Sequence, residues 1–178
     1  EAGLAGVPGL QCRIEERIAL QASIVRNGRA LKPVHAVNDI VITKKTGRML
    51  RLRVSINGKY FHEFPGDGLI LSTATGSTAY ALSAGGPIVS PELNVMMLTP
   101  ICPHTLFARA IVTNGEDEVS IELPQSRDDL LLIIDGQEEQ AVKSGDSITV
   151  RKAPFRAKYI RMSELHFYET VREKFNLK

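Results

Sequence analysis

Apolar and polar residues alternate in several short segments of this sequence. Every second residue is apolar at 18–24, 52–56 and 119–123, which is the period of a strand with one buried face. A β-branched run at 40–43 and an apolar run at 130–134 predict two more strands. Many short strands separated by turns are typical of a mainly β, sandwich-like domain.

Asn-Gly and Asp-Gly pairs mark tight turns between these segments. Such pairs occur at Asn27-Gly28, Asn57-Gly58 and Asp135-Gly136. They favour two-residue hairpin turns, because both residues of the pair adopt positive φ easily. The second pair therefore predicts a hairpin over residues 49–64.

The remaining elements are predicted with weaker patterns. An apolar run at 95–99 predicts a strand that enters a Pro-containing loop, and separate strands are expected near 148–150 and 157–162. Only residues 163–178 suit a long helix. Ser163 is its expected cap, and its apolar face is expected to hold Leu165, Tyr168, Val171 and Phe175.

The stretch GDGLILSTATGSTAYALSAGG, residues 66–86, is rich in Gly, Ser and Thr. We expect a buried strand at 69–71, a loop at 72–78 and a short helix at 77–84 that Gly85-Gly86 ends. Backbone N–H groups at such a helix start, with small side chains around them, suit a nucleotide. The stretch lacks the Walker ending and the dinucleotide-fold glycine spacing. A surface loop without a ligand is the alternative.

Two other polar segments have both a binding and a structural interpretation. Asn38-Asp39 begins an apolar strand, where an amide and a carboxylate side by side can grip the two hydroxyls of a ribose. A turn that starts a strand is the alternative. Gln137 follows a predicted hairpin turn and is either a turn residue or a ligand contact.

Composition narrows the class of protein. The 178 residues carry 22 Lys and Arg against 20 Asp and Glu, a net charge of +2, so bulk electrostatics predict neither nucleic-acid nor membrane binding. Cys12 and Cys102 lie far apart without metal-ligand spacing, which favours a reducing compartment. With no long apolar run and no secretory leader, we expect a cytoplasmic protein. Residues 1–12 are expected to be a connector from a missing N-terminal domain.

With these motifs in view, the sequence resembles the carboxy-terminal domain of bacterial NAD kinases from about residue 13 to residue 178. The resemblance rests on several motifs in one order: Asn38-Asp39, Gly66-Asp67-Gly68, residues 72–80, Leu82-Ser83, Gly85-Gly86, residues 99–104 and Asp135-Gly136-Gln137. It implies phosphorylation of the 2′-hydroxyl of the adenosine ribose of NAD to give NADP. It also implies ATP or polyphosphate as donor, a divalent cation such as Mg²⁺ or Mn²⁺, and a homodimer or homotetramer.

The resemblance also implies which residues bind NAD. Asn38 and Asp39 would bind the ribose and base, Asp67 would lie near the nicotinamide end, and the segment from Thr78 to Ser83 would form a wall around the adenosine. The full expected set is Asn38, Asp39, Arg48, Asp67, Thr75, Thr78, Ala79, Tyr80, Ala81, Leu82, Ser83 and Gln137.

The sequence departs from the family pattern at three points. Ala74 stands where proline is usual, and Asp39 stands where glutamate is more familiar. The family's catalytic aspartate lies in a Gly-Gly-Asp-Gly motif of an amino-terminal α/β domain, and this sequence has no such motif. We therefore assign no catalytic residue and no metal ligand, and expect the isolated chain to be inactive. A non-catalytic domain that binds or senses NAD is the alternative function.

Overall fold

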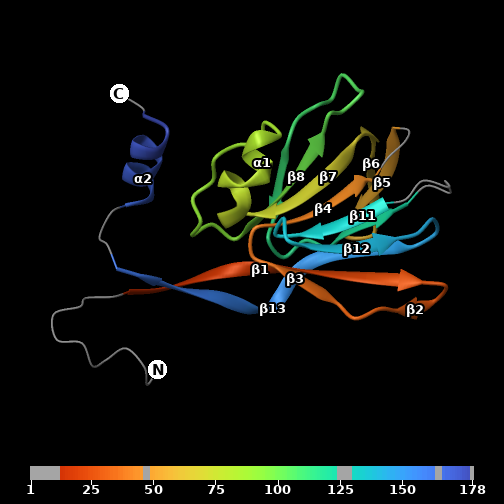
Figure 1. Ribbon diagram of the computed structural model, residues 1–178, viewed down its shortest axis with the longest axis horizontal. Helices are drawn as coiled ribbons and strands as arrows, with labels where there is room; N and C mark the ends of the chain where they lie inside the picture. Colours follow the sequence, from red (N-terminus) through yellow and green to blue (C-terminus); the bar gives the residue numbers. More distant parts are fainter. Residues whose placement is uncertain (1–12, 46–48, 124–129, 163–165, 177–178) are drawn as a thin grey trace.

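The computed structural model describes residues 13–45, 49–123, 130–162 and 166–176, and these form two antiparallel sheets with little helix (Figure 1). The first sheet has the order β2-β1-β13-β10-β5-β6, with β3 paired to β1. Its strands are β1 (Arg13–Arg26), β2 (Arg29–Ala30), β3 (Val34–Ala36), β5 (Leu50–Ile56), β6 (Lys59–Gly66), β10 (Val119–Glu122) and β13 (Ser147–Arg161). The mainly β fold is therefore confirmed.

The second sheet carries the short helices. Its order is β12-β11-β4-β7-β8-β9. The strands are β4 (Asp39–Lys44), β7 (Gly68–Thr73), β8 (Val95–Ile101), β9 (Ile111–Asn114), β11 (Leu130–Ile134) and β12 (Glu138–Val142). A 3₁₀ helix, η1 (Thr75–Thr78), and the helix α1 (Tyr80–Ser83) follow β7, and α2 (Phe167–Lys174) follows β13.

Two apolar clusters explain why some strands alternate buried and exposed residues while others are buried along their whole length. The larger cluster lies between the sheets and includes Leu52, Phe64 and Leu71. The smaller one lies on the other face of the second sheet, where Ile70 and Met97 pack with residues of α1. Because β7 is buried on both faces, its sequence is a continuous run of buried residues, whereas β5 alternates buried and exposed positions.

The three predicted hairpin turns are confirmed. Asn27 and Gly28 have φ of 49° and 74°, Asn57 and Gly58 have 50° and 74°, and Asp135 and Gly136 have 47° and 67°. Positive φ at both central residues is the geometry that matches the twist of the flanking strands.

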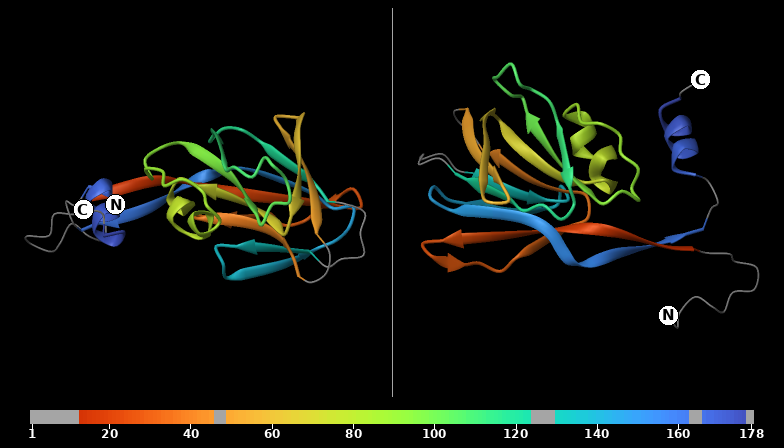
Figure 2. Two further views of the ribbon diagram at one scale, coloured as in Figure 1. Left: turned by 90° about the horizontal axis from the view of Figure 1, so that it is seen from above. Right: turned by 180° about the vertical axis from the view of Figure 1, so that it is seen from behind.

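The largest difference from expectation is a long ribbon of β1 and β13. The expected strands near 148–150 and 157–162 are parts of one strand of 15 residues, and β1 starts five residues before Ile18. Residues 13–18 pair with 156–161, and this part of the ribbon extends beyond the sheets (Figure 2). The β1 half of this ribbon end begins with residues 13–17, of which all but Ile14 are charged, so the period-two apolar pattern is apparent only from Ile18.

Two smaller expectations also need correction. The expected loop at 72–78 is shorter, because Ser72 and Thr73 complete β7 and residues 75–78 form a 3₁₀ helix. The C-terminal helix starts later than expected, with His166 as its N-cap, and Glu169 accepts a hydrogen bond from the His166 N–H at 2.9 Å. Ser163 and Leu165 lie outside the described residues, as do Arg48 and the expected connector at 1–12.

Candidate functional site

The Asn38-Asp39 segment and the Gly-Ser-Thr loop lie against each other. Strands β4 and β7 are neighbours, with Asp39 opposite Ser72. The Thr73 N–H donates to the Asn38 carbonyl oxygen at 2.9 Å, and the Thr73 hydroxyl donates to the Val37 carbonyl oxygen at 2.6 Å. The same hydroxyl oxygen accepts the Gly76 N–H at 3.0 Å. Thr73 therefore joins the start of the loop to the residues before β4.

Gly76 makes this approach possible. A Cβ atom on Gly76 would lie 2.1 Å from the Asn38 carbonyl oxygen and 2.6 Å from its carbonyl carbon. Both are backbone atoms, so no side-chain rotation relieves the overlap. The loop and the Asn38-Asp39 segment keep their spacing only because residue 76 is glycine.

Asp135 fixes the same segment from the hairpin turn between β11 and β12. Its carboxylate accepts backbone N–H groups from Val37 at 2.9 Å, Asn38 at 2.7 Å and Asp39 at 3.1 Å. Its own N–H donates to the Asp39 carbonyl oxygen at 3.0 Å. Three hydrogen bonds to one carboxylate define the backbone path at the start of β4.

The sequence did not identify this role of Asp135. The sequence predicts Asp135 as a turn residue, and the resemblance includes it in a motif without giving it a role, whereas its hydrogen-bond partners lie 96 to 98 positions earlier in the chain. An Asp-Gly pair in a hairpin has a sufficient local explanation, so no local signal could reveal the contact. Gln137, which the resemblance implies as an NAD contact, is exposed and lies two residues further along the same turn.

Asp39 is a buried carboxyl group with a perturbed pKa. Only 3% of the residue is exposed. Burial is the main cause that raises its pKa to about 6, the charge of Asp135 adds to the increase, and a hydrogen bond from the Tyr80 backbone N–H opposes it. Tyr80 is the first residue of α1, so Asp39 faces the start of that helix. A strongly perturbed carboxyl group is a frequent mark of a functional site.

The residues of the expected adenosine wall differ in exposure. Thr78, Tyr80 and Ser83 are exposed, and Ala79 and Leu82 are half-buried. Ala81 is buried against Ile70 and Met97, so it anchors α1 to the second sheet. Thr75 lies half-buried in η1.

Asp67 lies at the opposite end of β7 from this group. Its carboxylate pairs with the Lys44 ammonium at 2.6 Å, and its carbonyl oxygen accepts the Thr43 hydroxyl at 3.0 Å. Gly68 and Ser72 are four residues apart on β7, or about 13 Å at the usual rise of a strand. Asp39 and Asp67 can therefore contact one ligand only if it is extended.

The described part of the chain does not form a metal site. It has no group of three or more His, Cys, Asp or Glu residues that could hold an ion. Asp39 and Asp135 are neighbours, but both oxygens of Asp135 already accept backbone N–H groups. Within the same residues, no helix has the length and apolar character needed to cross a bilayer.

Comparisons with known proteins identify relatives that are named NAD kinase. Residues 37–162 match the family described as "ATP-NAD kinase C-terminal domain". An NAD kinase of Moorella thermoacetica is 49% identical over 163 residues, which are 91% of this chain and 52% of that protein. An NAD kinase of Carboxydothermus hydrogenoformans is 38% identical over 97% of this chain and 62% of its own length.

Solved structures agree in fold. Yeast NADH kinase complexed with NADH has a TM-score of 0.84 and 28% identity, with coverage of 93% of this chain and 49% of that one. An NAD kinase from Archaeoglobus fulgidus in complex with ATP has a TM-score of 0.71 and 25% identity, over 92% and 58%. The chain thus spans about half to three fifths of the length of these relatives. With the family match over most of its length, the chain belongs to the ATP-NAD kinase family and carries that family's C-terminal domain.

Proposed function

We propose that the protein containing this chain transfers a phosphoryl group from ATP or polyphosphate to the 2′-hydroxyl of the adenosine ribose of NAD, and that this chain binds the NAD. The observation that carries the proposal is the buried Asp39 carboxyl group, which faces the start of α1 while Asp135 holds the Asp39 backbone through its N–H. The relatives are named NAD kinases, which supports phosphorylation of NAD, and the resemblance of the sequence implies the 2′-hydroxyl as the acceptor.

In this proposal each part of the site has one task. The Asp39 carboxylate accepts hydrogen bonds from ribose hydroxyls, and the Asn38 amide contacts the ribose or base. Tyr80, with 46% of its surface exposed, covers the adenosine with its ring. Asp67 contacts the nicotinamide end, because an extended dinucleotide reaches along β7.

Phosphoryl transfer also needs groups that neutralise the transferred phosphate. We propose that a divalent cation, Mg²⁺ or Mn²⁺, accompanies the donor. The described residues do not fit this ion, so we assign it no ligand in this chain.

The 178-residue chain alone is expected to form no NADP from NAD and ATP, because the described residues include no metal site and the sequence lacks the catalytic motif. A coupled NADP assay on the purified chain measures this. Sustained NADP formation would contradict the assignment of catalysis to residues outside the chain. Binding of NAD by an intact protein that never forms NADP would instead support the alternative function, an NAD-binding or sensing domain.

Ala79→Leu is expected to abolish NAD binding while the free protein stays folded. Ala79 is half-buried between η1 and α1, and the larger side chain would occupy the space of the adenosine. A thermal-shift titration with NAD reports both properties, because a ligand that binds only the folded state raises its melting temperature. Ala30→Leu, on the exposed strand β2, is the control and should keep the full shift. A full NAD-induced shift in Ala79→Leu would remove this loop from the site.

A further inference from the structure

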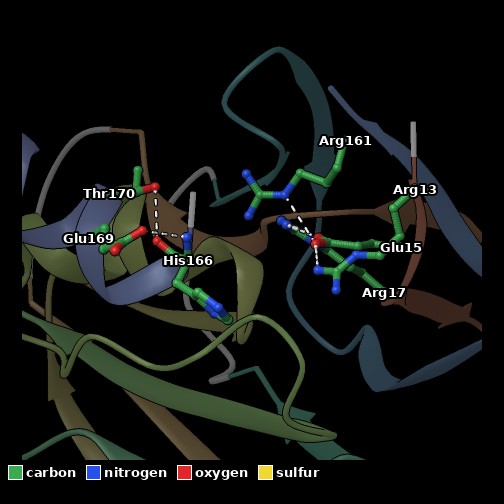
Figure 3. A network of polar contacts seen from close by, with 7 residues as sticks. All are labelled: Arg13, Glu15, Arg17, Arg161, His166, Glu169 and Thr170. Carbon is green, nitrogen blue, oxygen red and sulfur yellow. Dashed lines mark hydrogen bonds and ion pairs between the residues drawn. The ribbon is translucent and has the colours of Figure 1, made fainter. Parts of the chain in front are cut away.

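Two buried hydroxyl groups in the second sheet have no hydrogen-bond partner among the described residues. Ser72 is 0% exposed and Thr99 is 1% exposed, and neither the Ser72 Oγ atom nor the Thr99 Oγ1 atom makes a hydrogen bond. Glu15 in the β1–β13 ribbon shows the usual state of a polar group withdrawn from water, because its carboxylate pairs with three arginines (Figure 3). An unpaired buried hydroxyl destabilises a fold, so its presence calls for a reason.

Ser72 lies on the same face of the second sheet as Asp39. Side chains alternate between the two faces of a strand, and Ile40 and Leu71 belong to the apolar cluster between the sheets. Their chain neighbours Asp39 and Ser72 therefore point to the opposite face, toward α1. The two residues are direct partners across β4 and β7, a position in which Cβ atoms lie about 4.5–5.5 Å apart. Rotation about the Cα–Cβ bond of Ser72 thus brings its hydroxyl to the Asp39 carboxyl group.

Thr99 also faces α1 but lies farther from Asp39. Its partner across β7 and β8 is Ile70, and β7 separates β8 from β4, so two strand spacings, or about 10 Å, lie between Thr99 and Asp39. A Cβ atom on Gly86 would lie 3.2 Å from the Thr99 Oγ1 atom. This hydroxyl is therefore beneath the residues that follow α1, whereas Asp39 faces the start of that helix. Thr99 is a matched comparison for Ser72.

The Asp39 carboxyl group has the capacity for another donor. Among the described residues, the charge of Asp135 opposes its ionisation and the Tyr80 backbone N–H favours it. An ionised carboxylate accepts about four hydrogen bonds, and one donor compensates poorly for the burial of its charge. Asp135 offers no donor from its side chain, because its carboxylate accepts backbone N–H groups. The Ser72 hydroxyl is a buried donor within reach of Asp39, and no other described group uses it.

We propose that Ser72 is a positioning residue for Asp39: in the NAD complex, its hydroxyl donates to the ionised Asp39 carboxylate and fixes the oxygen that accepts the ribose hydroxyl. This inference rests on the proposed function for the identity of the ligand. A hydrogen bond to the charged form of a carboxyl group favours that form. Ser72 therefore stabilises the state of Asp39 that binds the ribose, and the hydroxyl that is unpaired in the free protein is paired in the complex.

The test measures the dissociation constant of NAD by calorimetry on the full-length protein at pH 8 and pH 5. Ser72→Ala is expected to raise the constant about tenfold at pH 8, because a hydrogen bond to a charged acceptor is lost. The increase should shrink at pH 5, where more of Asp39 is protonated and the lost bond no longer stabilises a charge. Thr99→Val removes the other unpaired hydroxyl, keeps the shape of the side chain and should leave the constant unchanged at both pH values.

A double-mutant cycle separates positioning from packing. If Ser72 acts through the charge of Asp39, Ser72→Ala in an Asp39→Asn background should change the NAD constant by less than about twofold. A packing role would weaken NAD equally in both backgrounds. Ser72→Ala leaves no partner unpaired, so the free protein should keep its stability in urea. Should this variant fail to fold, Ser72→Cys keeps the size of the side chain with a weaker donor and should raise the constant by a smaller factor.

The outcomes distinguish failure of this inference from failure of the proposed function. An unchanged constant in Ser72→Ala at pH 8 would overturn the inference, as would an equal loss of affinity in Thr99→Val or a loss that persists in the Asp39→Asn background. If Asp39→Asn bound NAD as tightly as the unchanged protein, the ribose assignment of Asp39 would be wrong, and the role of Ser72 with it. If the full-length protein bound NAD with a Ser72 effect that depends on Asp39 but formed no NADP, the positioning role would stand and only the proposed function would fall.

Discussion

Asp39→Asn is expected to weaken NAD binding by about tenfold to a hundredfold, because the loss of one charge-assisted hydrogen bond costs about 1.5–3 kcal/mol. The same change is expected to stabilise the protein without ligand at pH 7.5. Asn has nearly the same size and still accepts the Tyr80 N–H, but it has no charge to bury. Binding and stability should therefore change in opposite directions.

The pH dependence follows from the raised pKa of Asp39, about 6 in the folded protein against about 3.9 in an unfolded chain. The folded state holds the proton more tightly, so this group's contribution to stability is fully present below pH 4 and is lost as the pH rises through 6. The difference corresponds to about 3 kcal/mol at neutral pH, to order of magnitude. NAD affinity should follow the opposite course and fall as acidification below pH 6 protonates the acceptor.

Urea unfolding and NAD calorimetry between pH 5 and pH 8 measure both effects. Glu122→Gln removes one carboxylate from an exposed strand position and should alter neither quantity. If Asp39→Asn bound NAD as tightly as the unchanged protein, Asp39 would not be a ribose ligand. If its stability fell at pH 7.5, the burial cost of the carboxylate would be wrong.

Gly76→Ala is expected to eliminate NAD binding and to destabilise the fold by about 1–3 kcal/mol, the usual cost of overpacking. The new methyl group would overlap the Asn38 backbone, so either the loop or the start of β4 must move. Either movement separates Asp39 from α1. Thermal unfolding with and without NAD measures both changes.

The control for Gly76→Ala is a glycine whose loss destabilises the protein away from the site. Gly28 has positive φ and no atom within 4 Å of an added Cβ, so Gly28→Ala should cost about 1 kcal/mol through backbone strain alone and keep the NAD-induced shift. Normal NAD affinity in Gly76→Ala would show that the contact between the loop and Asn38 is unimportant for binding.

The sequence predicted those parts of the fold that have local causes. The Asn-Gly and Asp-Gly turns follow from backbone preferences of two residues, and the strands that pack on one face follow from alternation, as in β5. The ribbon end of β13 is predicted as a strand near 157–162, but its continuity with the strand near 148–150 and its pairing with residues 13–18 join distant segments and have no local cause. The start of α2 was also misplaced, because its side chains are not buried in the domain.

The candidate site also has features that the local sequence predicts and features that depend on the pairing of distant strands. The loop composition and the Asn38-Asp39 pair suggested nucleotide binding separately, but their contact through Thr73 and Gly76 depends on the pairing of β4 with β7. The three hydrogen bonds from the start of β4 to the Asp135 carboxylate depend on a further pairing, of β4 with β11. A cleft between Arg17, Arg161 and α2 joins residues from both ends of the chain, and no pattern within one segment predicts such a meeting.

The central position of β4 and β7 in the second sheet has a consequence for the motions that reach the site. Edge strands such as β9 and β12 fray most easily, whereas strands with two hydrogen-bonded neighbours open only with much of the structure. The segments around Asp39 and Gly76 continue from the two central strands. Fraying at either edge therefore leaves the geometry around Asp39 intact, and the binding surface persists for as long as the domain itself is folded.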